Sequence, residues 1–218
     1  MDWFAAVDAY CERPGPGYWA EPVNALTNLA FLLAAAVMWP RVRAQAAGRR
    51  LCALLAVIGV GSWLFHTHAN RLTGLLDVLP ILAFILLYLQ AASRDMLGLG
   101  RWQAVAVTLG FLPYAALTVP LWSRVPGLGS SAAYAPVPVL ILGFAGLLWR
   151  SAPATARGLA AGAGLLVLSL TFRSLDGPLC AALPFGTHFL WHLLNALMLG
   201  WMIEVWRRHR LAAAGRPR

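Results

Sequence analysis

Long runs of apolar residues, separated by short polar or basic segments, recur along the whole chain. A helix that crosses a membrane needs about 20 mostly apolar residues, with a range of about 17 to 25. The pattern predicts seven such helices, of which the second and the sixth are short and should extend into their flanking residues. The predicted spans are Val23–Pro40, Leu51–Phe65, Leu75–Ala92, Trp102–Leu121, Ala132–Trp149, Leu159–Phe172 and His188–Val205.

Together these spans predict an all-α membrane protein with seven transmembrane helices. They divide the chain into an outer N-terminal segment (1–22), a seven-helix transmembrane domain (23–206) and a basic cytoplasmic tail (207–218). The spans cover most of the chain and leave no room for a separate soluble domain.

The composition agrees with a surface that faces lipid. The chain is 60% hydrophobic and 11% charged, whereas a soluble domain carries roughly 25% charged residues. A net charge of +9 could indicate a nucleic-acid partner. We exclude nucleic acid because the basic residues lie at the ends of the apolar runs, where membrane proteins place them.

The arginines also predict an orientation. Thirteen of the 17 basic residues lie in the connections after spans 1, 3 and 5 or in the C-terminal tail, and such an excess marks the cytoplasmic side. The N-terminus is therefore expected outside and the C-terminus in the cytoplasm. Every basic residue is arginine, which is typical of GC-rich bacterial genomes, so we expect the inner membrane of a bacterium. The other side holds Arg13, Arg71, Arg124 and Arg173.

Several polar residues lie at the outer ends of spans 2, 3 and 7. Ionisable groups at membrane depth are costly, and each is therefore a functional candidate. The predicted topology brings the end of span 2 and the starts of spans 3 and 7 to one depth near the outer surface. The residues of this group are Ser62, His66, Asp77, His188 and His192.

The spacing within this group is typical of a metal site. His188 and His192 are four residues apart and share one helix face, which is how a helix offers two imidazoles to one ion. Ser62 and His66 have the same spacing, and Asp77 can return beside them after a short connection. Three neutral imidazoles and an open position suit catalytic zinc, although histidine also binds iron and copper. The alternative is that these histidines only pack at the membrane interface.

These residues carry a resemblance to a known family. Gly61-x4-His66, Leu76-Asp77-x-x-Pro80 and His188-x3-His192 resemble motifs of the alkaline ceramidases and of the wider superfamily that includes the adiponectin-type receptors. The segments from Val7 to Glu12 and from Ala20 to Asn28, and Asp176-x3-Cys180, are similar as well. The resemblance covers nearly the whole chain.

The resemblance implies an intramembrane zinc ion held by His66, His188 and His192. It implies that Asp77 contacts and activates the zinc-bound water and that Ser62 stabilises the developing oxyanion. The alternatives are that Ser62 donates to the carbonyl of Ile58 and that Asp77 orients a histidine. The implied reaction is the hydrolysis of ceramide to sphingosine and a fatty acid.

The N-terminal segment departs from the family. Eukaryotic alkaline ceramidases hold calcium with an Asp-Trp-Cys-Glu-x-Asn run and a later glutamate. Here Asp8 lies one residue further from the cysteine, and Pro14 stands at the asparagine position. Asp8, Glu12 and Glu21 still offer the oxygen ligands that calcium prefers, or they are simply solvated on the outer face.

Two cysteines are expected on the outer side, where disulfides are permitted. A bond between Cys11 and Cys180 would tie the N-terminal segment to the last outer connection.

The sequence therefore predicts a zinc-dependent hydrolase that cleaves ceramide or another N-acyl lipid, with its site toward the periplasmic side. The partners are the bilayer and a membrane lipid substrate, and the sequence does not predict an oligomeric state. Two alternatives stay open. One is a lipid esterase, and the other is a receptor or transporter in which the metal is structural.

Overall fold

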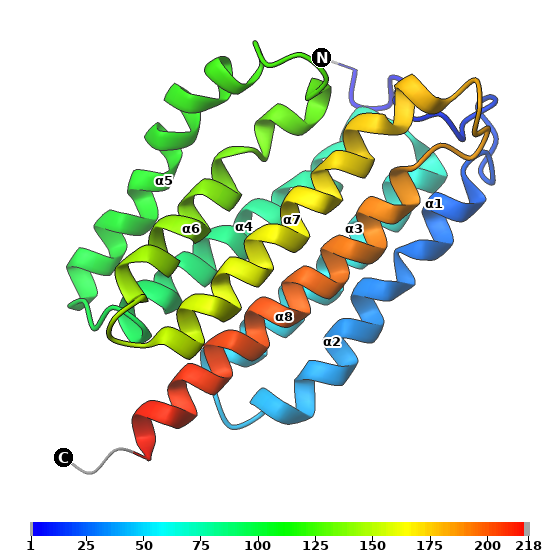
Figure 1. The fold of residues 1–218 in the computed structure, drawn as a ribbon. Helices are drawn as coiled ribbons and strands as arrows, with labels where there is room; N and C mark the ends of the chain where they lie inside the picture. The colour runs from blue at the N-terminus through cyan, green and yellow to red at the C-terminus, as the bar shows by residue number, and fades with distance from the viewer. Residues whose placement is uncertain (1, 216–218) are drawn as a thin grey trace.

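The structure, a computed structural model, describes residues 2–215 as a bundle of helices whose axes run side by side (Figure 1). Apart from loops and an isolated bridge between Ala6 and Asn70, the described chain is helical. The prediction of an all-α bundle is confirmed. The helices in chain order are α1 (Pro22–Thr27), α2 (Leu29–Val42), α3 (Ala46–His68), α4 (Arg71–Asp95), α5 (Arg101–Trp122), the 3₁₀ helix η1 (Gly129–Ala133), α6 (Pro136–Leu148), α7 (Pro153–Leu179) and α8 (His188–Ala214).

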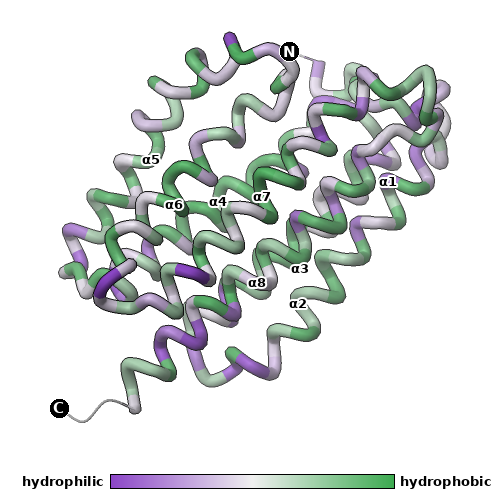
Figure 2. Tube along the Cα trace, viewed as in Figure 1, coloured by the Kyte–Doolittle hydropathy of each residue, from purple (hydrophilic) through white to green (hydrophobic). Residues whose placement is uncertain are grey.

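Six helical segments of the described chain are long and apolar enough to cross a membrane, when α1 and α2 are counted as one segment, Pro22–Val42. The six correspond to predicted spans 1, 2, 3, 4, 6 and 7. As expected, the second and sixth extend well into their flanking residues, to Ala46–His68 and Pro153–Leu179. These lengths indicate an integral membrane protein, and Figure 2 shows hydrophobic helix bodies with hydrophilic residues gathered toward the ends.

The fifth predicted span is shorter than expected. Within Ala132–Trp149 the chain forms the end of η1 and then α6, which has 13 residues. At 1.5 Å per residue this helix is about 20 Å long, whereas the hydrocarbon core is about 30 Å thick. Pro136 is the reason for the late start, because it has no amide hydrogen with which to continue a preceding helix but fits the first helical turn.

The centre of the bundle is formed by α3 and α8. Both are largely buried, and they are packed among α2, α4 and α7. Small residues let the helices approach closely: Gly158 and Gly162 of α7 face Val205 and Met202 of α8. Helix α5 lies at the edge of the bundle, against α4, whereas the candidate histidines lie on the two central helices.

The C-terminal helix is longer than predicted. It continues to Ala214 and so includes most of the segment assigned to a separate tail, while residues 216–218 lie outside the described chain. Glu204 accepts hydrogen bonds from Arg207 and Arg208, at 2.8 and 2.7 Å. Pairs three and four residues apart stabilise a helix, which accounts for the extension.

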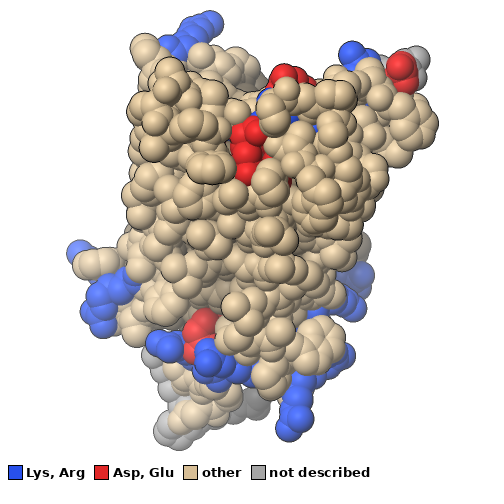
Figure 3. All heavy atoms as spheres, turned by 90° about the vertical axis from the view of Figure 1, so that its right-hand side faces the viewer, with Lys and Arg blue, Asp and Glu red and all other residues tan. Residues whose placement is uncertain are grey.

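The two ends of the bundle differ in charge. Basic side chains gather at the lower end in Figure 3, and acidic side chains mark the upper end, some of them in a hollow. The connection between α2 and α3 lies at the lower end of Figure 1, whereas the N-terminal segment, the end of α3 and the start of α8 lie at the upper end. The polar residues singled out from the sequence therefore share one end of the molecule.

Candidate metal centre

Three histidines meet between the end of α3 and the start of α8. Their side chains are almost completely buried: His66 is 0% exposed, and His188 and His192 are each 1% exposed. One ring nitrogen from each lies within 4.8 Å of those of the other two. The structure thus brings together the three residues predicted as zinc ligands.

One ring nitrogen of each histidine has no hydrogen-bond partner. These atoms are Nε2 of His66, Nδ1 of His188 and Nε2 of His192. Leaving a buried polar atom unpaired costs about 1–3 kcal/mol, so three such atoms in one cluster of histidines need an explanation. A metal ion bound by three neutral imidazoles would supply it, and the donor set fits zinc.

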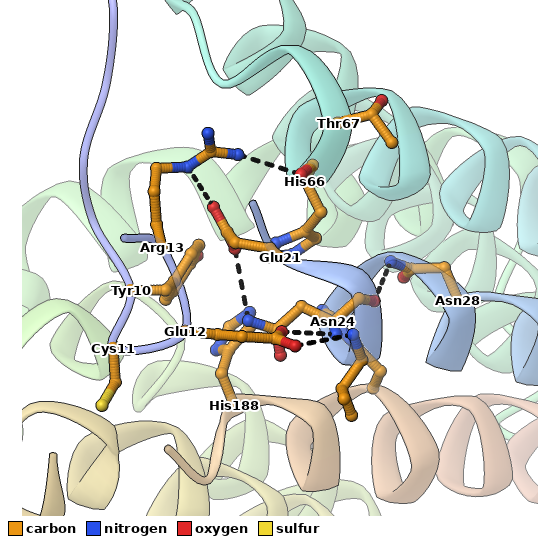
Figure 4. Close-up of polar contacts among 12 residues, drawn as sticks. Tyr10, Cys11, Glu12, Arg13, Glu21, Asn24, Asn28, His66, Thr67 and His188 are labelled. Carbon is orange, nitrogen blue, oxygen red and sulfur yellow. Dashed lines mark hydrogen bonds and ion pairs between the residues drawn. The ribbon is translucent and has the colours of Figure 1, made fainter. Parts of the chain in front are cut away.

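The opposite nitrogens of two of these histidines have fixed partners. Nδ1 of His66 lies 2.5 Å from Oε2 of Glu21, and Nδ1 of His192 lies 3.0 Å from Oγ1 of Thr27 (Figure 4 shows the first contact). Such partners hold the rings in place and select the nitrogen that faces the metal. The second contact joins α1 to α8.

Asp77 and Ser62 lie beside the histidines. The Asp77 carboxyl group lies within hydrogen-bond reach of the Ser62 hydroxyl and near His66. The two helices come this close because Gly61 has no side chain: a methyl group there would overlap the carbonyl oxygen of Leu76.

The start of α8 is held by Asp176. Its Oδ1 accepts hydrogen bonds from the backbone N–H groups of Thr187 and His188, at 2.8 and 2.9 Å. Its Oδ2 accepts one from Cys11 at 3.0 Å. A carboxylate at a helix N-terminus satisfies free N–H groups and the helix dipole, so Asp176 fixes the turn that carries His188.

The N-terminal segment is fastened over the site. Cys11 and Cys180 form the disulfide that was considered from the sequence. Next to it, the ring of Tyr10 stacks on His188 with 3.7 Å between ring centroids. The Tyr10 hydroxyl lies 3.5 Å from Arg173, and burial raises the pKa of this hydroxyl above its usual value. Tyr10 therefore covers one side of the histidine cluster as a neutral ring.

Loss of this disulfide should loosen the cover and lower stability. We expect Cys180→Ser to cost about 2–4 kcal/mol, because the bond closes a long stretch of chain, across a sequence separation of 169. Thermal unfolding with and without dithiothreitol measures the effect. Dithiothreitol should lower the thermal unfolding midpoint of the wild type but not that of Cys180→Ser. The control is Cys52→Ala, which changes the free buried cysteine; its midpoint should fall with dithiothreitol as that of the wild type does. An unchanged midpoint in Cys180→Ser would contradict this role.

The carboxylates predicted as calcium ligands have other partners. Glu12 accepts hydrogen bonds from the N–H groups of Val23 and Asn24 at the start of α1, at 2.7 and 2.8 Å, and burial raises its pKa. Burial also acts on Glu21, but hydrogen bonds and charges from His66 and Arg13 outweigh it and lower the pKa. Asp8 is exposed. Calcium binding stays a prediction.

Tyr10, Arg13 and Arg173 were not recognised from the sequence as parts of the site. The sequence placed Arg13 and Arg173 only among the arginines of the predicted outer side. Their positions relative to the histidines depend on how the N-terminal segment and α7 fold back. Arg173 lies over the rings of Tyr134 and Trp191, at 5.4 and 5.5 Å from the centroids. No spacing within the sequence joins these residues.

An apolar cavity lies among α4, α6, α7 and α8. Its empty volume is about 620 Å³, part of it open to the surroundings. Trp191 and Asn195, which flank His192 on α8, lie at one end, and Tyr88 and Met202 lie further along. From Trp191 to Met202 the helix rises about 16 Å, so the cavity extends along α8 from the level of Trp191 toward the basic end of the bundle.

A comparison with families adds to this geometry. A family model described as Ceramidase matches residues 10–215, which is almost the entire chain. No curated protein matches the chain.

Proposed function

The chain belongs to the ceramidase family, and on that premise we propose that it is an intramembrane zinc-dependent amide hydrolase. Its substrate is ceramide or a related N-acyl lipid, which it cleaves to a fatty acid and an amine. The observation that carries the proposal is the buried cluster of His66, His188 and His192, each with one unpaired ring nitrogen, beside Asp77.

The residues of the site suit this chemistry. A zinc ion held by the three histidines would polarise the amide carbonyl and activate water near neutral pH. The Asp77 carboxylate accepts a proton from the attacking water and delivers it to the nitrogen of the leaving amine. The Ser62 hydroxyl donates to the carbonyl oxygen as negative charge builds there.

The cavity supports a lipid substrate. It is lined mostly by apolar side chains, and one of them, Trp191, precedes His192 on α8, so an acyl chain placed in it would direct its carbonyl group toward the histidine end of that helix. A long chain of this kind is the part that ceramide shares with other N-acyl lipids and with lipid esters. The amine portion would lie toward the end of the bundle where Tyr10 and Arg173 gather.

Orientation follows from charge. Because most arginines lie at the opposite end of the bundle, we infer that the site opens toward the outer leaflet or outer space. For a bacterial protein this is the periplasmic side of the inner membrane.

A panel of lipids tests the proposed function. The purified protein, in detergent or in vesicles, is supplied with ceramides, other N-acyl lipids and matched esters, and released fatty acid is measured. We expect turnover on amides that stops when a strong zinc chelator is added and returns with zinc. Turnover of esters alone would make the protein an esterase. Bound zinc with no turnover on any lipid would favour the receptor or transporter alternative.

A further inference from the structure

A buried ion pair lies directly behind one metal ligand. The side chain of Arg13 is 5% exposed and that of Glu21 is 2% exposed, and Nε of Arg13 lies 2.5 Å from Oε1 of Glu21. The other oxygen of Glu21 lies 2.5 Å from Nδ1 of His66. One carboxylate thus joins the guanidinium to the imidazole (Figure 4).

The same guanidinium binds two backbone carbonyls. It donates to the carbonyl of Gly15 at 3.1 Å and to the carbonyl of His66 itself at 2.9 Å. Each of the three guanidinium nitrogens therefore donates a hydrogen bond. Because the guanidinium group is planar and rigid, it holds these three partners in a fixed geometry. His66 is held twice, through its ring by Glu21 and through its backbone by Arg13.

We propose that Arg13 is a positioning residue for the metal centre, which acts through Glu21 to hold the His66 ring with Nε2 facing the ion. The inference rests on the proposed function, because it requires that the three histidines bind zinc. The Arg13 guanidinium contacts the Glu21 carboxylate and two backbone carbonyls, and it would act on a bound metal only through these partners. Its guanidinium holds the Glu21 carboxylate in place against the His66 ring, and its hydrogen bonds to the carbonyls of Gly15 and His66 tie the N-terminal segment to the end of α3.

The ion pair also bears on the predicted calcium site. The guanidinium already supplies a positive charge to Glu21, and the backbone N–H groups of Val23 and Asn24 engage Glu12. The guanidinium of Arg13 thus takes the place that a calcium ion would have beside Glu21, behind the zinc centre. Added calcium should therefore leave the zinc affinity of the wild type unchanged.

Zinc affinity measures this role without reference to turnover. The full chain in detergent is titrated with zinc alone in competition with a chromophoric chelator, and the thermal midpoint of the zinc-free protein is measured in parallel. Arg13→Ala should raise the zinc dissociation constant by about 10- to 100-fold, the usual effect of losing a partner behind a metal ligand. Arg71→Ala, which changes an exposed arginine at the same end of the bundle, is the matched control and should bind as the wild type does.

Further variants distinguish an effect of Arg13 on the position of the His66 ring from an effect on the stability of the fold alone. Arg13→Lys keeps the positive charge, and it serves as the test variant if Arg13→Ala fails to fold. It should bind zinc more weakly than the wild type, because an ammonium group cannot donate the same three hydrogen bonds in the geometry of the guanidinium. In a Glu21→Gln background, Arg13→Ala should weaken zinc binding little further. Free guanidinium, at concentrations that leave the fold intact, should restore part of the affinity of Arg13→Ala.

The outcomes are distinct. A lower midpoint with an unchanged zinc dissociation constant would overturn the inference, and so would additive effects of the Arg13 and Glu21 substitutions. Calcium that tightens zinc binding in the wild type would overturn it as well. Failure of the wild type to bind zinc would remove the proposed function itself, whereas equal binding by wild type and Arg13→Ala would remove only the role of Arg13.

Discussion

Asp77→Asn is expected to keep its bound zinc and to lose about 10²- to 10⁴-fold in turnover, the usual contribution of general acid–base catalysis. The amide has nearly the shape of the carboxylate, so the contact with Ser62 and the packing of α4 against α3 should survive. What is lost is the group that accepts the proton of the attacking water and returns it to the amine. Zinc content and fatty-acid release, measured on the same preparation, test both halves of the prediction.

The matched control is Asp95→Asn. Asp95 lies on the same helix at the opposite end, where it pairs with Trp206 and Arg210, far along the chain from the site. This variant should retain turnover per folded molecule. If Asp77→Asn lost zinc, Asp77 would instead help to hold the metal site together, and if it kept full turnover, its role as acid and base would be wrong.

Gly61→Ala is expected to damage both fold and activity. The added methyl group would overlap the backbone carbonyl of Leu76, which cannot move aside as a flexible side chain could. The helices α3 and α4 must separate there, at a cost of about 1–3 kcal/mol for overpacking. Because Ser62 and Asp77 are the next residues on the two helices, their contact should be lost and turnover should fall with the thermal midpoint.

Gly164→Ala is the control for this substitution. Gly164 also lies inside a long helix, α7, but a methyl group there would meet nothing within 4 Å. Alanine favours a helix over glycine by roughly 0.5–1 kcal/mol, so the midpoint should stay or rise and turnover should be unchanged. Equal effects of the two substitutions would contradict the close contact at Gly61.

Much of the fold was predictable because hydrophobic length alone identifies helices that can cross a membrane. The helix from Arg101 to Trp122 agrees with its predicted span to within one residue at each end. The span around Pro136 was predicted too long, since hydropathy does not register the missing amide of proline. The end of α8 was predicted too early, because basic residues after Val205 lower hydropathy while their pairing with Glu204 supports the helix.

The candidate site was predictable where its residues share a helix or meet by topology. His188 and His192 lie one turn apart, and the alternation of spans brings His66 and Asp77 to the same end. Tyr10 and Arg13 could not be found in this way, since they belong to a segment without regular periodicity. Their positions depend on tertiary contacts: the bond of Cys11 to Cys180 and the carboxylate of Asp176 that binds the Cys11 amide.

The most direct test of the metal-dependent hydrolase is to measure zinc content and fatty-acid release together, for the wild type and for His188→Ala. We expect about one zinc ion per chain in the wild type, as for a catalytic three-histidine site, with turnover of an N-acyl lipid, and loss of both in the variant. A wild type that binds no zinc but still releases fatty acid, or a variant that keeps both properties, would contradict the assignment of the histidine cluster as the catalytic centre.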